Sequence, residues 1–357
     1  MNLQESLQLA VQKGASDVHF SVGRPIMVRV DGSLVELTPD VLKPEDTLEY
    51  LLPIISEKLR ADLDEKGEID FAYSLAGIGR FRLNVFKQRG TLAAALRLLP
   101  FKIPAPETLG IPPAVIEMTT KKRGLVLVTG PTGSGKSTTL ASLINVINHN
   151  RDEHIITLED PIEYLHRSDK SIVNQREVGL DTMGYGPALR AALRQDPDII
   201  LLGEMRDLDT ISTAVTAAET GHLVFSTLHT IGAASTIDRI IDVFPPHQQE
   251  QIRVQLATVL ECVVSQALLP TADIEGGRAA AFEVMIANPA IRNLIREGKT
   301  FSIPSTMQTN KKSGMITLDD SLYELYLKRK VSAEKALEFA QDYNYLARKL
   351  GYNGMSI

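Results

Sequence analysis

Residues 130–137 have the composition of a phosphate-binding loop. They read Gly-Pro-Thr-Gly-Ser-Gly-Lys-Ser and fit the pattern GxxxxGK[ST]. Glycines let backbone N–H groups turn around phosphate oxygens without a Cβ in the way, and the N-terminus of a following helix adds favourable partial charge. Lys136 is placed for the β- and γ-phosphates of a nucleotide, and the Ser137 hydroxyl for Mg²⁺. The residues predicted to bind ATP are Gly130, Pro131, Thr132, Gly133, Ser134, Gly135, Lys136, Ser137 and Thr138.

A later segment supplies a carboxylate of the kind that nucleotide hydrolysis requires near Mg²⁺. Residues 198–204 form an apolar run that ends in Glu204, which is the Walker B pattern with Glu in the usual place of Asp. Glu204 is therefore predicted to hold Mg²⁺ directly or through water. Taken alone, such an acid could equally cap a turn at the surface.

A second acidic segment, residues 159–164, reads Glu-Asp-Pro-Ile-Glu-Tyr and also follows an apolar run. We interpret Glu163 as the general base or as the residue that positions the attacking water. Glu159 and Asp160 are interpreted as groups that support the catalytic residues or are linked to the metal. The combination of two acidic segments with the phosphate loop favours the catalytic interpretation over isolated surface turns.

Two histidines stand at the two ends of one short predicted strand. His222 and His229 are seven positions apart, which is too far for the helical H-x-x-x-H arrangement that binds zinc. His229, with Ser226 and Thr227 nearby, is either a sensor of the γ-phosphate or a buried, hydrogen-bonded structural histidine. For His222 the spacing favours the structural interpretation.

These side chains require a scaffold that gathers strand ends at one edge. Apolar segments typical of strands alternate with helical segments along the chain. After the loop, for example, Leu140, Leu143 and Ile147 fall at helical spacing. This alternation predicts an α/β fold with a mostly parallel sheet covered on both faces. Ligands bind at the carboxyl ends of such strands, so both acidic segments should point toward the loop. The predicted strands are 125–128, 155–158, 199–202 and 223–226.

The chain of 357 residues has room for two or three domains at about 100–200 residues each. Residues 1–99 predict a small mixed α/β domain. Five prolines crowd the next segment, which predicts a semi-rigid linker at 100–116 that disfavours helix and sheet. The second domain, 117–357, is predicted to be mainly helical from about residue 288.

Composition excludes several classes of protein. The net charge of −6 and the aromatic content of 5% argue against binding of nucleic-acid strands, which uses basic grooves and stacking rings. The single cysteine, Cys262, excludes a disulfide framework and a four-cysteine zinc site. No apolar run approaches the ~20 residues of a membrane span, and the N-terminus has no signal-peptide pattern. We therefore expect a cytoplasmic protein with no nucleic-acid partner.

Together the motifs resemble the secretion ATPase superfamily. Its four sequence marks occur in order, namely the Walker A loop 130–137, the acidic box 157–164, the Glu-type Walker B 199–204 and the histidine box 221–229. Residues 290–299, Ala-Ile-Arg-Asn-Leu-Ile-Arg-Glu-Gly-Lys, are similar to the signature of the type IV pilus retraction ATPases within that superfamily. The likeness runs from residues 15–19 to about Asp320, which is nearly the whole chain.

The resemblance implies a homo-hexameric ring of subunits, each with a PAS-like N-terminal domain and a RecA-like ATPase domain, with ATP between the two. It implies a motor at the cytoplasmic face of the inner membrane that turns a pilus platform protein and so returns pilin to the membrane, which produces twitching motility. It also implies that Arg82 and Arg97 reach the ATP phosphates. The chemistry suits this role, since arginine stays charged and can bind two phosphate oxygens. Without the resemblance, exposed surface arginines would be the simpler interpretation.

Two further features take their meaning from the resemblance. Arg190 and Arg194 lie four positions apart, so they are expected to share a helical face that either bridges to a neighbouring subunit or is solvated. Ile291 and Leu294 belong to the retraction signature and are expected to matter for retraction rather than for hydrolysis, although packing alone also explains their apolar spacing.

Several alternatives remain at this point. A pilus extension or type II secretion ATPase is the nearest, and the missing four-cysteine motif and shorter N-terminal region count against it. A RecA-like nucleic-acid translocase is disfavoured by the acidic charge, and a scaffold that does not hydrolyse is disfavoured by Lys136, Glu163 and Glu204. A GTPase is disfavoured because residues 310–313, Asn-Lys-Lys-Ser, lack the Asp of the guanine-reading motif.

Overall fold

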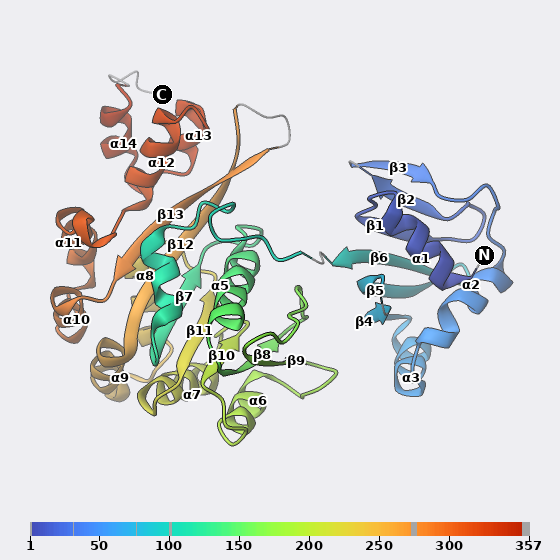
Figure 1. The fold of residues 1–357 in the computed structure, drawn as a ribbon, viewed down its shortest axis with the longest axis horizontal. Coiled ribbons are helices and arrows are strands. Elements are labelled where there is room, and N and C mark those ends of the chain that lie inside the picture. Colours follow the sequence, from blue (N-terminus) through green and yellow to red (C-terminus); the bar gives the residue numbers. More distant parts are fainter. Residues whose placement is uncertain (1, 31, 76, 100–101, 273–276, 352–357) are drawn as a thin grey trace. The chain divides into compact units, whose positions relative to one another are not determined.

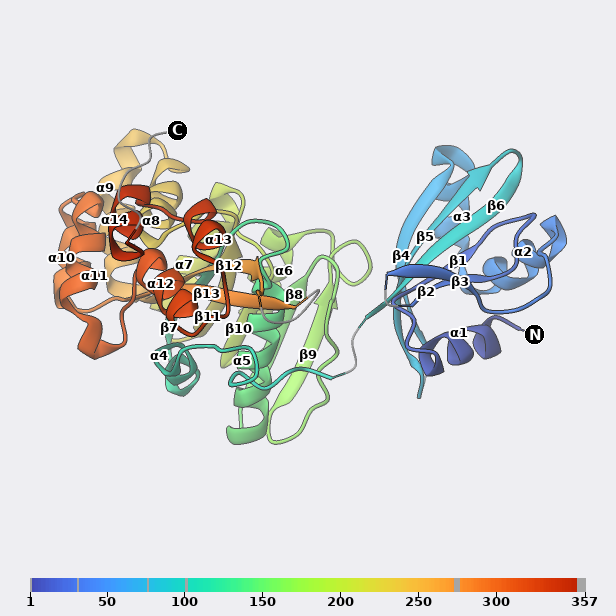
Figure 2. The same cartoon turned by 90° about the horizontal axis from the view of Figure 1, so that it is seen from above.

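The computed structural model describes residues 2–30, 32–75, 77–99, 102–272 and 277–351. The chain divides into two compact units, one made of residues 1–102 with 163–165 and the other of residues 103–162 with 166–357 (Figures 1 and 2). Each unit has its own sheet, with one apolar core in the first unit and separate cores on the two faces of the sheet in the second. The two are described separately below.

The first unit is a six-stranded antiparallel sheet in the order β3-β2-β1-β6-β5-β4. One face of the sheet packs against three helices in a single core that contains Leu7, Leu51 and Leu63 from the helices and Phe81 and Leu96 from the strands. The strands are β1 (Asp17–Phe20), β2 (Met27–Val30), β3 (Ser33–Glu36), β4 (Glu68–Leu75), β5 (Gly79–Gln88) and β6 (Thr91–Leu99), and the helices are α1 (Leu3–Gln12), α2 (Pro44–Leu51) and α3 (Glu57–Lys66).

The second unit is built on a seven-stranded sheet in the order β13-β12-β7-β11-β10-β8-β9, in which only the β12–β13 pair is antiparallel. Successive residues of β7 alternate between two cores, with Leu125 in one and Val126 in the other, so helices cover both faces. The predicted α/β fold with a mostly parallel, doubly covered sheet is confirmed. The strands are β7 (Gly124–Thr129), β8 (His154–Glu159), β9 (Ile172–Glu177), β10 (Ile199–Leu202), β11 (Leu223–Leu228), β12 (Leu260–Pro270) and β13 (Arg278–Ile286).

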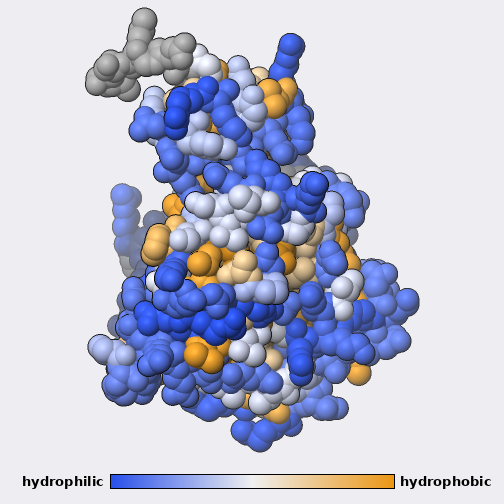
Figure 3. Space-filling view, turned by 90° about the vertical axis from the view of Figure 1, so that its left-hand side faces the viewer, coloured by the Kyte–Doolittle hydropathy of each residue, from blue (hydrophilic) through white to orange (hydrophobic). Residues whose placement is uncertain are grey.

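The helices of the second unit fall into a sheet-covering set and a C-terminal set. The first set is α4 (Pro113–Ile116), α5 (Lys136–Asn150), α6 (Tyr185–Ala192), α7 (Leu208–Glu219), α8 (Ala233–Asp242) and α9 (Pro246–Val259). The second is α10 (Pro289–Arg296), α11 (Ile303–Thr309), α12 (Leu318–Leu327), α13 (Ala333–Glu338) and α14 (Tyr343–Lys349). The side of the second unit on which α9, α10 and α11 lie is mostly hydrophilic, with hydrophobic residues gathered near its centre (Figure 3).

Two local predictions differ from the structure. The proline-rich segment, which is expected to disfavour helix, contains the short helix α4, which begins at Pro113, because proline suits the first position of a helix, where its missing N–H is not needed. Ile111 and Val115 are also buried in a core of the second unit, so this part of the segment is packed rather than a free linker. Arg194 does not lie on the helix of Arg190, since α6 ends at Ala192.

None of the helices among the described residues combines the length and the apolar character that crossing a membrane requires. The only cysteine of the sequence, Cys262, is fully buried in β12.

Candidate functional site

The predicted phosphate loop joins β7 directly to α5. Gly130, Gly133 and Gly135 all have positive φ values, of 140°, 80° and 88°. Residues that carry a Cβ rarely adopt such backbone angles. A Cβ on Gly130 would lie 2.3 Å from the carbonyl oxygen of Gln266 and 2.8 Å from Ser134 Oγ. The glycines are therefore required by the backbone path and by the close approach of β12.

The polar groups of the loop suit a bound anion. Lys136 Nζ is buried and donates to the carbonyl oxygens of Gly130 at 2.9 Å and Pro131 at 3.0 Å, which holds the ammonium over the loop. Ser134 Oγ is buried and has no hydrogen-bond partner among the described residues, so an oxygen ligand in the loop would satisfy it. Ser137 lies in the first turn of α5, at the positive end of the helix dipole.

A residue that sequence analysis missed holds the loop in place. Gln266, on β12, is 5% exposed; its Nε2 donates to the carbonyl of Ser134 at 2.6 Å, and its Oε1 accepts from Thr139 Oγ1 at 2.8 Å. Gln266 thus ties the end of the loop to the first turns of α5. No local pattern reveals it, because it is 132 positions from Ser134.

Replacing Gln266 with leucine should weaken nucleotide binding by about tenfold, since it leaves a buried carbonyl and a buried hydroxyl without partners at a cost of about 1–3 kcal/mol each. The dissociation constant of a fluorescent ATP analogue measures the effect. Thr139→Val, which removes only one of the two contacts, should show a smaller loss. Wild-type affinity in a folded Gln266→Leu protein would contradict a role for this side chain in shaping the loop.

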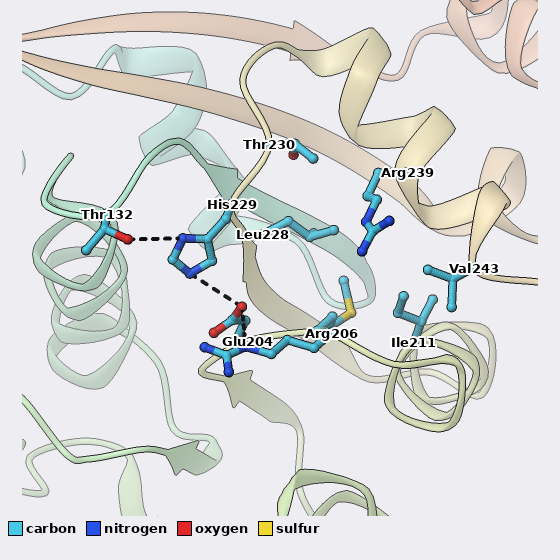
Figure 4. A pocket seen from close by; sticks show the side chains of 10 residues that line it. Thr132, Glu204, Arg206, Ile211, Leu228, His229, Thr230, Arg239 and Val243 are labelled. Atoms are coloured by element: carbon cyan, nitrogen blue, oxygen red, sulfur yellow. Dashed lines mark hydrogen bonds and ion pairs between the residues drawn. The ribbon is translucent and has the colours of Figure 1, made fainter.

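Glu204 and His229 lie together beside the loop (Figure 4). The Glu204 carboxylate, which follows β10, lies 3.4 Å from His229 Nε2 and 2.6 Å from Arg206 Nε. His229 Nδ1 is in turn 3.4 Å from Thr132 Oγ1 of the loop. His229, at the end of β11, thereby connects the phosphate loop to the Walker B carboxylate, as expected for strand ends that share one edge of a parallel sheet.

These residues line a cavity of about 550 Å³, whose wall away from the loop is formed by Ile211, Leu228, Arg239 and Val243. His222 lies at the opposite end of β11, where its Nδ1 donates to the carbonyl of Ala217 at 2.9 Å. This position fits the structural interpretation of His222 and separates it from the cavity.

The acidic segment after β8 contains residues of different exposure. Glu159 accepts hydrogen bonds at Oε1 from Thr157 Oγ1 at 2.6 Å and from Gln175 Nε2 at 3.0 Å. Glu163 is exposed on the loop that follows and is not among the residues that line the cavity.

Tyr185, another residue that sequence analysis missed, stands between the acidic segment and the Walker B strand. A Cβ on Gly203 would lie 2.7 Å from its hydroxyl oxygen. Burial, followed by the nearby carboxylates of Asp160 and Glu204, raises the pKa of Tyr185 above its usual range. The hydroxyl therefore stays protonated near neutral pH and remains a hydrogen-bond donor within an acidic cluster.

Arg82 and Arg97 lie directly opposite each other on β5 and β6, on the sheet face that the helices of the first unit leave uncovered. Arg97 Nε donates to Asp17 Oδ1 at 2.9 Å. This ion pair offsets part of the repulsion between the two arginines, since like charges placed opposite each other across two strands are unfavourable.

The remaining predicted residues are engaged within the chain. The Arg190 guanidinium lies 2.6 Å from Asp209 on α7, and Arg194 Nη1 donates to the carbonyl of Arg190 at 3.0 Å. In α10, Ile291 is fully buried in the core, whereas Leu294 is only partly buried. Packing therefore accounts for Ile291, and Leu294 is the more accessible of the two.

The chain matches the model of the type II/IV secretion system protein family over residues 1–325. It is 49% identical to the Type IV pilus retractation ATPase PilT of Pseudomonas aeruginosa, over 96% of this chain and 98% of that protein. It is 46% identical to the Twitching motility protein of Neisseria gonorrhoeae, over 88% of this chain and 84% of that protein. Among solved structures, the pilus retraction motor PilT with bound ADP aligns with a TM-score of 0.91 and 51% identity, covering 98% of this chain and 99% of that one.

Proposed function

Since this chain belongs to the family of type II/IV secretion system proteins, we propose that it is an ATP-hydrolysing motor that drives retraction of type IV pili. The arrangement that supports hydrolysis is the meeting of the phosphate loop with Glu204 and His229 at one edge of the sheet. The likeness over nearly the full length of a retraction ATPase supports the biological role.

The loop residues and Lys136 bind the phosphates of ATP in this proposal. Ser137 and Glu204 hold Mg²⁺, which neutralises charge on the phosphates when it is bound. No group of three or more acidic, histidine or cysteine residues that could hold a metal occurs among the described residues.

Glu163 serves as the general base or positions the attacking water, with Glu159 and Asp160 in support. His229 senses the γ-phosphate, because it lies between the loop hydroxyl of Thr132 and the carboxylate of Glu204. Arg82 and Arg97 supply positive charge to the phosphates from the first unit.

A second cavity, distinct from the one lined by Glu204 and His229, is the proposed binding site for the nucleoside part of ATP. This cavity, of about 330 Å³, is lined by Gly135 and Thr138 of the loop and first turn, by the apolar side chains of Leu109 and Leu268, and by Arg278. The lining combines apolar and polar side chains in about equal measure, so it offers a flat heterocyclic base both an apolar contact surface and hydrogen-bond partners.

The assembly proposed for this chain is a homo-hexamer at the cytoplasmic face of the inner membrane. Its direct partner is the pilus platform protein, and its action reaches pilin indirectly. Leu294 and the rest of α10 are proposed to contribute to retraction rather than to hydrolysis.

Deletion of the gene in its own organism tests retraction against extension. A retraction motor predicts cells with many pili and no twitching, whereas a motor for extension or assembly predicts cells without pili. Pilus number by electron microscopy and the diameter of twitching zones are the measurements. Complementation with the wild-type gene should restore twitching, and complementation with Lys136→Ala should not.

A further inference from the structure

The acidic segment is held at both of its ends by one side chain of the neighbouring strand. β9 is one of the two edge strands of the sheet (Figure 1). It runs parallel to β8, with Glu159 in register with Glu177. Gln175 on β9 donates from Nε2 to Glu159 Oε1 at 3.0 Å. Its Oε1 accepts from the backbone N–H of His166 at 2.8 Å. One amide thus joins the first residue of the segment to the residue two places beyond its end.

A second side chain of β9 holds the middle of the segment. The carboxylate of Glu177, a residue that is 4% exposed, accepts at Oε2 from the backbone N–H of Ile162 at 3.1 Å. Ile162 is equally buried and directly precedes Glu163. A buried backbone N–H needs an acceptor, so this contact sets where the chain leaves the core just before Glu163.

The residue types match these contacts. At position 175 the side chain must donate to a carboxylate and accept from an N–H at the same time, and the amide of Gln175 does so through two separate atoms, Nε2 and Oε1. At position 177 the contact to Ile162 requires only an acceptor, which a carboxylate supplies. Neither residue lines the cavity beside the phosphate loop.

We propose that Gln175 and Glu177 are positioning residues for ATP hydrolysis, which act by fixing the backbone on the two sides of Glu163. The inference rests on the proposed role of Glu163 as base or water-positioning residue. Between the two fixed points, residues 162 and 166, the chain has no regular secondary structure. The direction of the Glu163 side chain therefore depends on how firmly those points are held.

The test replaces Gln175 with glutamate. Gln175→Glu keeps the length of the side chain and the oxygen that accepts from His166. It replaces the donor to Glu159 with a second carboxylate, which repels the carboxylate of Glu159. The turnover number should fall about tenfold or more, because a displacement of about 1 Å at a catalytic group can reduce the rate about a hundredfold. The dissociation constant of an ATP analogue should stay within about twofold of wild type, since the phosphate loop is untouched.

The neighbouring Asn174→Asp makes the same chemical change on the other side of the strand, where Asn174 Oδ1 lies 2.9 Å from His154 Nε2. It should keep the wild-type turnover number. If Gln175→Glu also keeps it, or if both variants lose rate and affinity in parallel, the proposal is wrong.

A double-mutant cycle separates this inference from the function on which it rests. Single-turnover rates are compared for Gln175→Glu, Glu163→Gln and the double variant. If Gln175 acts through Glu163, the double variant should be no slower than Glu163→Gln alone, whereas multiplied effects would refute the positioning role. Wild-type turnover in Glu163→Gln would overturn the assignment of Glu163 itself and this inference with it.

A pair of variants at Glu177 covers the case in which Gln175→Glu does not fold. Glu177→Gln keeps an oxygen acceptor for Ile162 and should retain at least about half of the wild-type rate, whereas Glu177→Leu should lose about tenfold. Folding of both is checked by circular dichroism. Equal turnover of these two variants would contradict the proposal.

Discussion

Replacement of Lys136 by alanine is expected to weaken nucleotide binding by about a hundredfold or more and to reduce ATP turnover to background. The Lys136 side chain is only 9% exposed, and its ammonium is held at the loop by the carbonyl oxygens of Gly130 and Pro131. A hydrogen bond to a charged group contributes about 1.5–3 kcal/mol, and this ammonium can make more than one to phosphate oxygens. A loss of about 3 kcal/mol corresponds to about a hundredfold in affinity.

The measurements for this variant are the dissociation constant of a fluorescent ATP analogue and the steady-state release of phosphate. Lys122→Ala removes an exposed lysine just before β7 and should behave as wild type in both. Circular dichroism checks that the Lys136→Ala protein is folded, because its loop loses two internal hydrogen bonds. Unchanged turnover would refute the assignment of residues 130–137 as the phosphate-binding loop.

Glu163→Gln is expected to lower ATP turnover by about a hundredfold or more while nucleotide binding persists, because general acid–base catalysis typically contributes about 10²–10⁴ in rate. Glutamine has nearly the size of glutamate but accepts no proton from water at neutral pH. Glu163 is exposed and lies outside the lining of the cavity beside the loop, so its replacement should leave the fold and the phosphate contacts intact.

Asp169→Asn is the matched control, since Asp169 is another exposed carboxylate on the connection between β8 and β9. Its turnover should equal that of wild type. Pre-steady-state measurements on Glu163→Gln should show ATP bound at normal affinity and cleaved slowly. A parallel loss of affinity and turnover would instead indicate that Glu163 takes part in binding, and wild-type turnover would remove it from the mechanism.

The sequence predicts the chemistry of this protein where the chemistry lies in contiguous residues. The phosphate loop needs glycines at set spacing, a lysine and a hydroxyl, and all of them fall within residues 130–137. The position of Glu204 at the end of an apolar strand is equally local, and the rule that parallel strands end at one edge places it near the loop. The contact between His229 and Glu204 agrees with that rule.

Several strands of the structure are not predicted from the sequence. β1 has only four residues, which carry little periodic signal, and β9 lies at a sheet edge, where no continuous apolar run is needed. β12 and β13 are also missed, although β12 lies inside the sheet between β7 and β13 and is largely buried. The helical face expected for Arg190 and Arg194 fails because Asp196 precedes Pro197, and the residue before a proline disfavours the helical conformation.

The sequence by itself thus determined the phosphate loop, the Walker B carboxylate, the α/β class and, through resemblance, the family. Only the tertiary structure decided which distant side chains hold these parts in place. There are three examples. Gln266 holds the phosphate loop, Tyr185 lies against Gly203, and Gln175 holds the acidic segment. Their roles depend on the order of strands in the sheet and on the register between strands. Strand order and register are set by long-range packing, so they cannot be predicted from composition or local spacing.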